Sequence, residues 1–215
     1  MNEDTSAKIL KKLKEQQKEE GKLPLLLEFY QKLLRAQSAV RKSITGPGAI
    51  PGSEEIQTRL AEGKPLITFD ELIIDWELLR KFFVEVIGIF ARYTELFGEL
   101  PDSLKKPEAR TLLTEEAVKN WFTGNALPAA LTADISPTLI QMIVQSAVYP
   151  FLTKHVQALK DAWKKELKDE WRREYCPFCG GSPDMAYLEP EVGARCLVCS
   201  RCDSAWSYQR LQCPY

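Results

Sequence analysis

The chain lacks the excess of positive charge that would indicate a polyanionic partner. Its 215 residues include 29 Lys and Arg against 30 Asp and Glu, which gives a formal net charge of −1. Proteins that bind phosphate backbones present a clustered excess of Lys and Arg. We therefore expect no nucleic-acid partner.

The sequence also lacks a long apolar run. The stretch Phe82–Val84 is soon interrupted by Glu85, far short of the about 20 apolar residues that a membrane helix needs. The N-terminal residues contain no apolar core and no cleavage site of a signal peptide. We expect a cytoplasmic protein without membrane insertion, in which thiols stay reduced.

Signatures of enzyme sites are missing. The sequence contains no phosphate-binding loop and no GxGxxG, GxSxG or HExxH pattern. Its one histidine, His155, falls in the middle of a predicted helix with no partner motif, which favours a place on the helix surface or in helix packing over catalysis. We expect that the protein is not an enzyme.

Cysteine is absent from the first 175 residues, and all six cysteines follow. This composition boundary predicts a helical domain over residues 23–175 and a cysteine module over residues 176–215. Residues 1–22 carry six lysines matched by five acids and few apolar positions, which predicts a charged helix or flexible arm. The predicted fold class is α plus small β, an all-helical N-terminal domain followed by a rubredoxin-like or zinc-ribbon-like module.

Apolar residues at helical spacing place the helices. Thr68 and Glu71 form a predicted capping box at the start of a long apolar helix that ends near Gly98. Ser53 is the expected cap of a short helix over 54–62, residues 101–110 are an expected loop, and another short helix follows Thr114. A last helix starts at Ser136–Pro137 and resumes after a break or kink at Pro150, as far as Trp171.

Two C-x-x-C pairs dominate the end of the chain. They are Cys176 with Cys179 and Cys199 with Cys202, and 19 residues separate the inner two cysteines. Two cysteines three positions apart on a tight turn bring their sulfurs to about 3.5–4 Å, as a tetrahedral metal at about 2.3 Å requires. A disulfide or redox pair is the alternative, but the βαβ setting of a redox C-x-x-C is absent. We predict one zinc or iron ion held by these four cysteines.

Flanking residues fit this interpretation. Gly180 permits a positive φ that would turn backbone N–H groups toward the sulfurs, and Asp203 occupies the same place in the second pair. Strands are expected at 184–188, 194–198 and 205–211, with a hairpin turn at 189–193. Cys196 lies outside both pairs and is interpreted as a buried strand residue.

The cysteine block resembles a known family. The stretch Cys176-Pro-Phe-Cys-Gly-Gly-Ser-Pro183, followed by Arg195-x3-Cys199-x2-Cys202-x3-Trp206-x3-Arg210-x2-Cys213, is similar to the formate dehydrogenase accessory proteins, the FdhE-like family. The helical part is similar in the stretches from Pro24 to Gln37 and from Ala147 to Phe151.

The resemblance implies a helical domain and two rubredoxin-like or zinc-ribbon-like modules, each with two C-x-x-C pairs. It implies a cytoplasmic helper that acts on the formate dehydrogenase catalytic subunit during maturation, with Cys176, Cys179, Cys199 and Cys202 as metal ligands. A third pair would start at Cys213, but its second cysteine would lie beyond Tyr215. We read this as a truncated form or a natural short form, and expect one metal and a free thiol at Cys213.

Two other functions stay open at this point. A rubredoxin-like electron carrier would require iron that cycles between two oxidation states. A nucleic-acid-binding zinc ribbon is disfavoured, because residues 176–215 contain three Arg against four acids. The oligomeric state cannot be read from the sequence.

Overall fold

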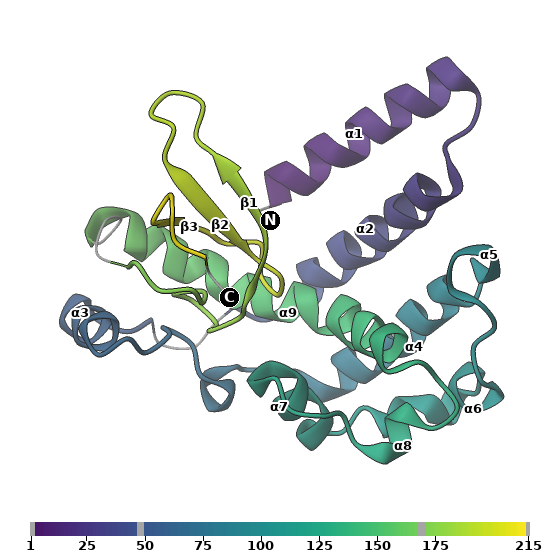
Figure 1. The fold of residues 1–215 in the computed structure, drawn as a ribbon. Helices are drawn as coiled ribbons and strands as arrows, with labels where there is room; N and C mark the ends of the chain where they lie inside the picture. Colours follow the sequence, from purple (N-terminus) through teal and green to yellow (C-terminus); the bar gives the residue numbers. More distant parts are fainter. Residues whose placement is uncertain (1–2, 47–49, 167–170, 214–215) are drawn as a thin grey trace. The chain divides into compact units, whose positions relative to one another are not determined.

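The structure is a computed structural model that describes residues 3–46, 50–166 and 171–213 (Figure 1). It is mostly helical, with one small antiparallel sheet near the C-terminus, which confirms the predicted fold class. The chain forms two compact units. One comprises Gly46–Ile73 and Leu152–Tyr215, and the other comprises Asn2–Thr45 and Ile74–Phe151. The limits 23–175 and 176–215 stay a prediction, since these units group the chain differently.

The unit built from Asn2–Thr45 and Ile74–Phe151 is helical. It contains α1 (Glu3–Glu20), α2 (Leu25–Ser43), α4 (Trp76–Phe90), α5 (Thr94–Phe97), α6 (Asp102–Lys105), η2 (Pro107–Leu112), α7 (Glu115–Thr123), α8 (Ala129–Thr132) and the first half of α9 (Pro137–Glu166). Phe29 of α2 makes edge contacts with Phe90, Tyr93 and Phe97, at ring-centroid distances of 4.9, 5.5 and 4.7 Å. These aromatic pairs join α2 to the end of α4 and to α5.

The predicted capping box is present, but it caps a different element. Thr68 and Glu71 cap the single 3-10 turn η1 (Phe69–Glu71), after which the chain is extended. The long apolar helix α4 starts instead after Asp75, whose side chain accepts a hydrogen bond from the Leu78 N–H at 3.0 Å. An Asp cap three residues before a free amide N–H satisfies that donor as well as a Thr cap would.

Other predicted helix limits need correction. Gly52, not Ser53, is the N-cap of α3 (Ser53–Ala61). The stretch 101–110 is not a loop, since it holds α6 and most of η2. The apolar helix ends at Phe90, and it is the short α5 that ends at Gly98, where φ is +75°. The Thr114 cap is confirmed, because its hydroxyl accepts from the Ala117 N–H at 3.1 Å.

Pro150 does not break the last helix. α9 runs from Pro137 to Glu166 with Pro150 inside it, and the boundary between the two compact units falls directly after, between Phe151 and Leu152. The predicted continuation over residues 167–170 lies outside the described residues, and Trp171 is no longer helical.

The unit built from Gly46–Ile73 and Leu152–Tyr215 contains α3, η1, the second half of α9 and the sheet. The sheet has the order β1-β2-β3, formed by β1 (Pro183–Leu188), β2 (Arg195–Cys199) and β3 (Ala205–Tyr208), all antiparallel (Figure 1). The predicted hairpin turn is confirmed, because Glu189 N–H donates to Ala194 O and Gly193 N–H to Glu189 O, each at 2.8 Å. The turn brings the two C-x-x-C pairs to the same end of the sheet.

Candidate metal centre

The side chains of Cys176, Cys179, Cys199 and Cys202 converge on one buried point, with all four sulfurs within 4.8 Å of one another. Cys179 Sγ lies 3.5 Å from Cys199 Sγ and 3.6 Å from Cys202 Sγ, and Cys176 Sγ lies 3.6 Å from Cys202 Sγ. These separations fit a tetrahedron with metal–sulfur bonds of about 2.3 Å, whose edge is about 3.8 Å. The four sulfurs are thiols rather than disulfides, so the donor set suits a thiophilic ion such as zinc or iron.

The two knuckles, residues 176–180 and 199–203, have the same backbone design. Gly180 N–H donates to Cys176 O at 2.9 Å, and Asp203 N–H donates to Cys199 O at 3.1 Å. Gly180 and Asp203 adopt φ of +69° and +53°, which confirms the left-handed geometry predicted for both positions. The N–H groups of Gly180 and Asp203 themselves bind these carbonyl oxygens, and the predicted approach of a backbone N–H to a sulfur occurs at Arg201. Arg201 supplies the N–H that approaches a sulfur, at 3.4 Å from Cys199 Sγ.

A second glycine, Gly181, lies in close contact with one of the four sulfurs. A Cβ at Gly181 would lie 2.9 Å from Cys199 Sγ and 3.1 Å from the Arg201 side chain. This separation is shorter than an ordinary contact, so any side chain at Gly181 would displace the sulfur. Glycine is therefore needed at both positions after Cys179, for two different reasons. Gly180 adopts a positive φ, and Gly181 lies close to the sulfur of Cys199.

Burial and hydrogen bonding shift the pKa values of Cys176 and Cys202 in different directions. Burial raises the pKa of the Cys176 thiol, and hydrogen bonding with the other three cysteines raises it further. Burial also favours a higher pKa at Cys202. The hydrogen bonds with Cys176, Cys179, Cys199 and Ser204 outweigh this effect and hold the pKa of Cys202 below its usual range. The Ser204 hydroxyl, itself buried, lies 3.1 Å from Cys202 Sγ. A cation bound among the sulfurs would stabilise all four as thiolates.

A segment far away in the sequence is attached to the first knuckle. Leu66 N–H donates to Pro177 O at 2.9 Å, and Ile67 N–H donates to Phe178 O at 2.8 Å. Pro65 also lies against Gly180, where a Cβ would meet its ring at 3.0 Å. We call residues 64–68 the strap. Leu66 and Ile67 are buried, so the strap covers the knuckle with apolar side chains as well as with hydrogen bonds.

Charged and aromatic side chains hold both ends of the strap. Arg59 of α3 donates to Leu66 O at 3.1 Å and to Glu71 Oε2 at 3.0 Å. The hydroxyl of Tyr175, one residue before Cys176, donates to Gly63 O at 2.7 Å. Sequence reasoning missed the strap, because nothing local in residues 64–68 marks a backbone pairing with residues more than 100 positions later.

The remaining singled-out residues lie outside the sulfur cluster. His155 is buried, and its Nε2 accepts a hydrogen bond from Ile73 N–H at 3.0 Å, which confirms a packing role. Cys196 is buried in β2, as predicted. Cys213 is exposed and does not join the four sulfurs. Residues 214 and 215, which follow Cys213, lie outside the described residues.

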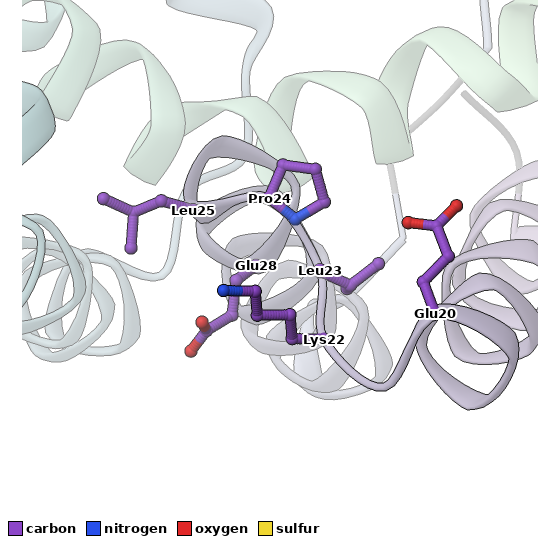
Figure 2. Close-up of a pocket in the computed structure, with 6 residues that line it drawn as sticks. All are labelled: Glu20, Lys22, Leu23, Pro24, Leu25 and Glu28. Atoms are coloured by element: carbon purple, nitrogen blue, oxygen red, sulfur yellow. The ribbon is translucent and has the colours of Figure 1, made fainter.

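A separate hollow lies at the turn between α1 and α2 (Figure 2). Its lining includes Glu20, Lys22 and Glu28 around Leu23 and Pro24. The Glu28 carboxylate already pairs with Lys32 of the next turn at 3.2 Å. The Glu20 carboxylate accepts a hydrogen bond from Gln16 at 3.2 Å. Carboxylates paired with neighbours on their own helix are typical of a solvated helix surface, so we assign no chemistry to this hollow.

None of the helices in the described ranges combines the length and the apolar character that a membrane span requires. This matches the short apolar runs of the sequence.

Comparisons with known proteins agree with the resemblance read from the cysteine block. No family model matches the chain. It is 25% identical over 192 residues to the Protein FdhE homolog of Aquifex aeolicus (strain VF5), an alignment that covers 87% of this chain and 62% of that protein. The chain thus spans less than two thirds of the length of this curated relative.

A solved structure supports the fold. The crystal structure of the FdhE protein from Pseudomonas aeruginosa matches 100% of this chain and 70% of that one, with a TM-score of 0.57 and 19% sequence identity. At such low sequence identity, the structural match supports a shared fold and nothing further. The chain is thus similar to FdhE proteins, in sequence over most of its length and in fold over all of it.

Proposed function

We propose that this chain is a cytoplasmic accessory factor that binds the catalytic subunit of formate dehydrogenase and aids its assembly or activation. The observation that carries the proposal is the FdhE-like sequence and fold, joined to an intact four-cysteine cluster. The absence of catalytic signatures from the sequence supports a binding role rather than turnover.

The four cysteines are the proposed ligands of one zinc or iron ion. Four sulfur ligands fill a tetrahedron and leave no open position for water or substrate, which supports a structural or electron-carrying ion rather than a hydrolytic one. The chain's own contribution is to hold the two knuckles in register through the β1–β2 pairing and to keep solvent away through the strap. A module this small has little core of its own, so a bound ion would supply much of its stability.

Co-purification with the catalytic subunit tests the proposed function. The tagged chain is expressed in an anaerobic, formate-grown host, purified with its metal intact, and probed for the catalytic subunit. Retention by the unaltered chain and by Cys196→Ser, with loss in Cys199→Ser, is the expected result. Cys196 is the matched control because it is a buried cysteine of β2 outside the cluster. No retained subunit on a metal-loaded chain would count against the accessory role.

Electron transfer is the second candidate, favoured by one observation, the all-sulfur donor set. Such a site can hold iron that cycles between two oxidation states. Elemental analysis of anaerobically purified protein separates the two functions. Zinc, or iron that cannot be reversibly reduced, would exclude the electron carrier and leave the accessory role standing.

A further inference from the structure

The outer edge of the sheet carries an unusual group of exposed apolar side chains. β1 is an edge strand, since β2 is its only neighbour among the described strands. Met185, Tyr187 and Leu188 of this strand are 65%, 44% and 53% exposed, and Val192 in the following turn is 74% exposed. Natural proteins usually protect an edge strand with charges, prolines or bulges. β1 has such features only at its start, where Pro183, Asp184 and an irregularity in the register precede Met185, and the stretch Met185–Leu188 has none. An apolar edge left open to solvent indicates a surface that another chain covers.

The backbone of β1 can accept another strand. Because Glu189 N–H donates to Ala194 O, alternation along the antiparallel ladder makes Tyr187 a hydrogen-bonded partner of Cys196. The N–H and C=O groups of Ala186 and Leu188 then point away from β2, toward the open edge. An extended segment placed along this edge could form backbone hydrogen bonds with these N–H and C=O groups.

Charge specifies what kind of segment fits. The hairpin from Pro183 to Ala194 contains Asp184, Glu189 and Glu191 and no Lys or Arg. None of these three carboxylates forms an ion pair with a residue in the described part of the chain. Glu189 Oε1 accepts a hydrogen bond from the Cys196 thiol at 3.8 Å, which leaves its negative charge uncompensated. Carboxylates without an ion pair, close in sequence to exposed apolar side chains, are complementary to a segment that combines apolar residues with Lys or Arg.

We propose that the open edge of β1 binds an extended segment of a protein partner, rich in apolar and basic residues, by adding it to the sheet as a fourth strand. The identity of that partner as the formate dehydrogenase catalytic subunit rests on the proposed function, whereas the class of segment rests on the edge itself. A second copy of this chain is the competing occupant. Its own hairpin would bring three more carboxylates to the contact, so like charges would oppose that pairing.

Peptide binding to the metal-loaded full chain tests the edge directly. Two fluorescein-labelled ten-residue peptides, one of alternating Val and Lys and one of alternating Val and Glu, are titrated by fluorescence anisotropy. We expect the Val–Lys peptide to bind at least about tenfold more tightly than the Val–Glu peptide, because only the former complements the carboxylates. Equal affinities, or no binding of the Val–Lys peptide, would overturn the proposal.

Ala186→Pro is the diagnostic variant, because proline removes an outward N–H and is tolerated on an edge strand. It should lower affinity for the Val–Lys peptide at least about tenfold while metal content and the circular dichroism spectrum stay unchanged. If Ala186→Pro fails to retain metal, Glu191→Lys replaces it, and this reversal should weaken Val–Lys binding and strengthen Val–Glu binding. Unchanged affinity in a folded variant contradicts strand addition.

Two further measurements separate the competing outcomes. Sedimentation that shows a dimer of the unaltered chain and a monomer of Ala186→Pro would assign the edge to a second copy and overturn the proposal. In the co-purification experiment, equal retention of the catalytic subunit by both chains would refute the edge as its binding surface and leave the accessory function intact. Peptide binding as expected, without any retained subunit, would refute the accessory function and leave the edge as a binding surface.

Discussion

Loss of the metal should release the strap, although the strap lies far from every cysteine in the sequence. In Cys199→Ser one sulfur is replaced by a hydroxyl, which is a poor ligand for a thiophilic ion. The first knuckle then has no ion to hold it, and the carbonyl oxygens of Pro177 and Phe178 are no longer fixed where Leu66 and Ile67 meet them. The amide protons of Leu66 and Ile67 should therefore exchange faster.

The structure sets the size of this effect. Two backbone hydrogen bonds contribute about 2 kcal/mol together, which corresponds to about 30-fold faster exchange of both amides. Complete detachment would also expose Leu66 and Ile67, which are 1% and 5% exposed, and would add about 1.5–3 kcal/mol for each side chain. The expected acceleration is thus about 30-fold or more.

Hydrogen–deuterium exchange with mass spectrometry, on peptides that cover residues 63–72, measures the release. Cys196→Ser, with its cluster intact, should exchange like the unaltered chain. Peptides from α4, which belongs to the other compact unit, provide the internal reference. Full protection of Leu66 and Ile67 in a metal-free Cys199→Ser protein would refute the coupling between strap and metal.

Gly181→Ala should weaken metal binding at least about tenfold in a chelator competition, because its Cβ would lie 2.9 Å from Cys199 Sγ. Gly88→Ala, whose Cβ meets nothing within 4 Å, should leave affinity unchanged, and equal affinities would show that the sulfur moves freely. Arg59 holds the pKa of Glu71 at about 2, against an ordinary 4.5, so the contribution of Glu71 to stability is complete above about pH 4.5 and is lost as the pH falls through about 2. Glu71→Gln should therefore lower the free energy of unfolding, measured in urea near neutral pH, by about 1 kcal/mol, after allowance for the partial exposure of Glu71. Below about pH 2 the variant and the unaltered chain should be equally stable, and a difference that persists in acid would contradict this assignment. Elemental analysis should find one zinc or iron per chain, and a second ion would require ligands outside the four-sulfur cluster.

Local chemistry made the cysteine cluster predictable. Each knuckle consists of neighbouring residues, so the spacing of Cys176 and Cys179 fixes the separation of their sulfurs, and the positive φ at Gly180 and Asp203 follows from residue type. The hairpin was predictable for the same reason, since the turn residues and the two short strands that they separate lie within one short stretch.

Helix limits were less predictable, because several local signals compete within a few residues. Thr68 and Glu71 form the capping box that their spacing predicts, yet Asp75 starts the long helix. Between Glu71 and Asp75 the chain is not helical, and Ile73 N–H donates a hydrogen bond to His155 Nε2 of α9. A capping motif determines which amides it can satisfy, but tertiary contacts decide whether a helix continues beyond it.

The sequence by itself determined the cluster of four cysteines, the left-handed geometry of the two knuckles and the similarity to FdhE proteins, because those features rest on residue types at short, fixed spacing. Only the tertiary structure showed that Leu66 and Ile67 pair with the first knuckle and that, among the described strands, β1 has a neighbour on one side alone. Pairing between distant backbone segments depends on which surfaces meet after folding, and backbone N–H and C=O groups carry no residue-specific mark of their partner.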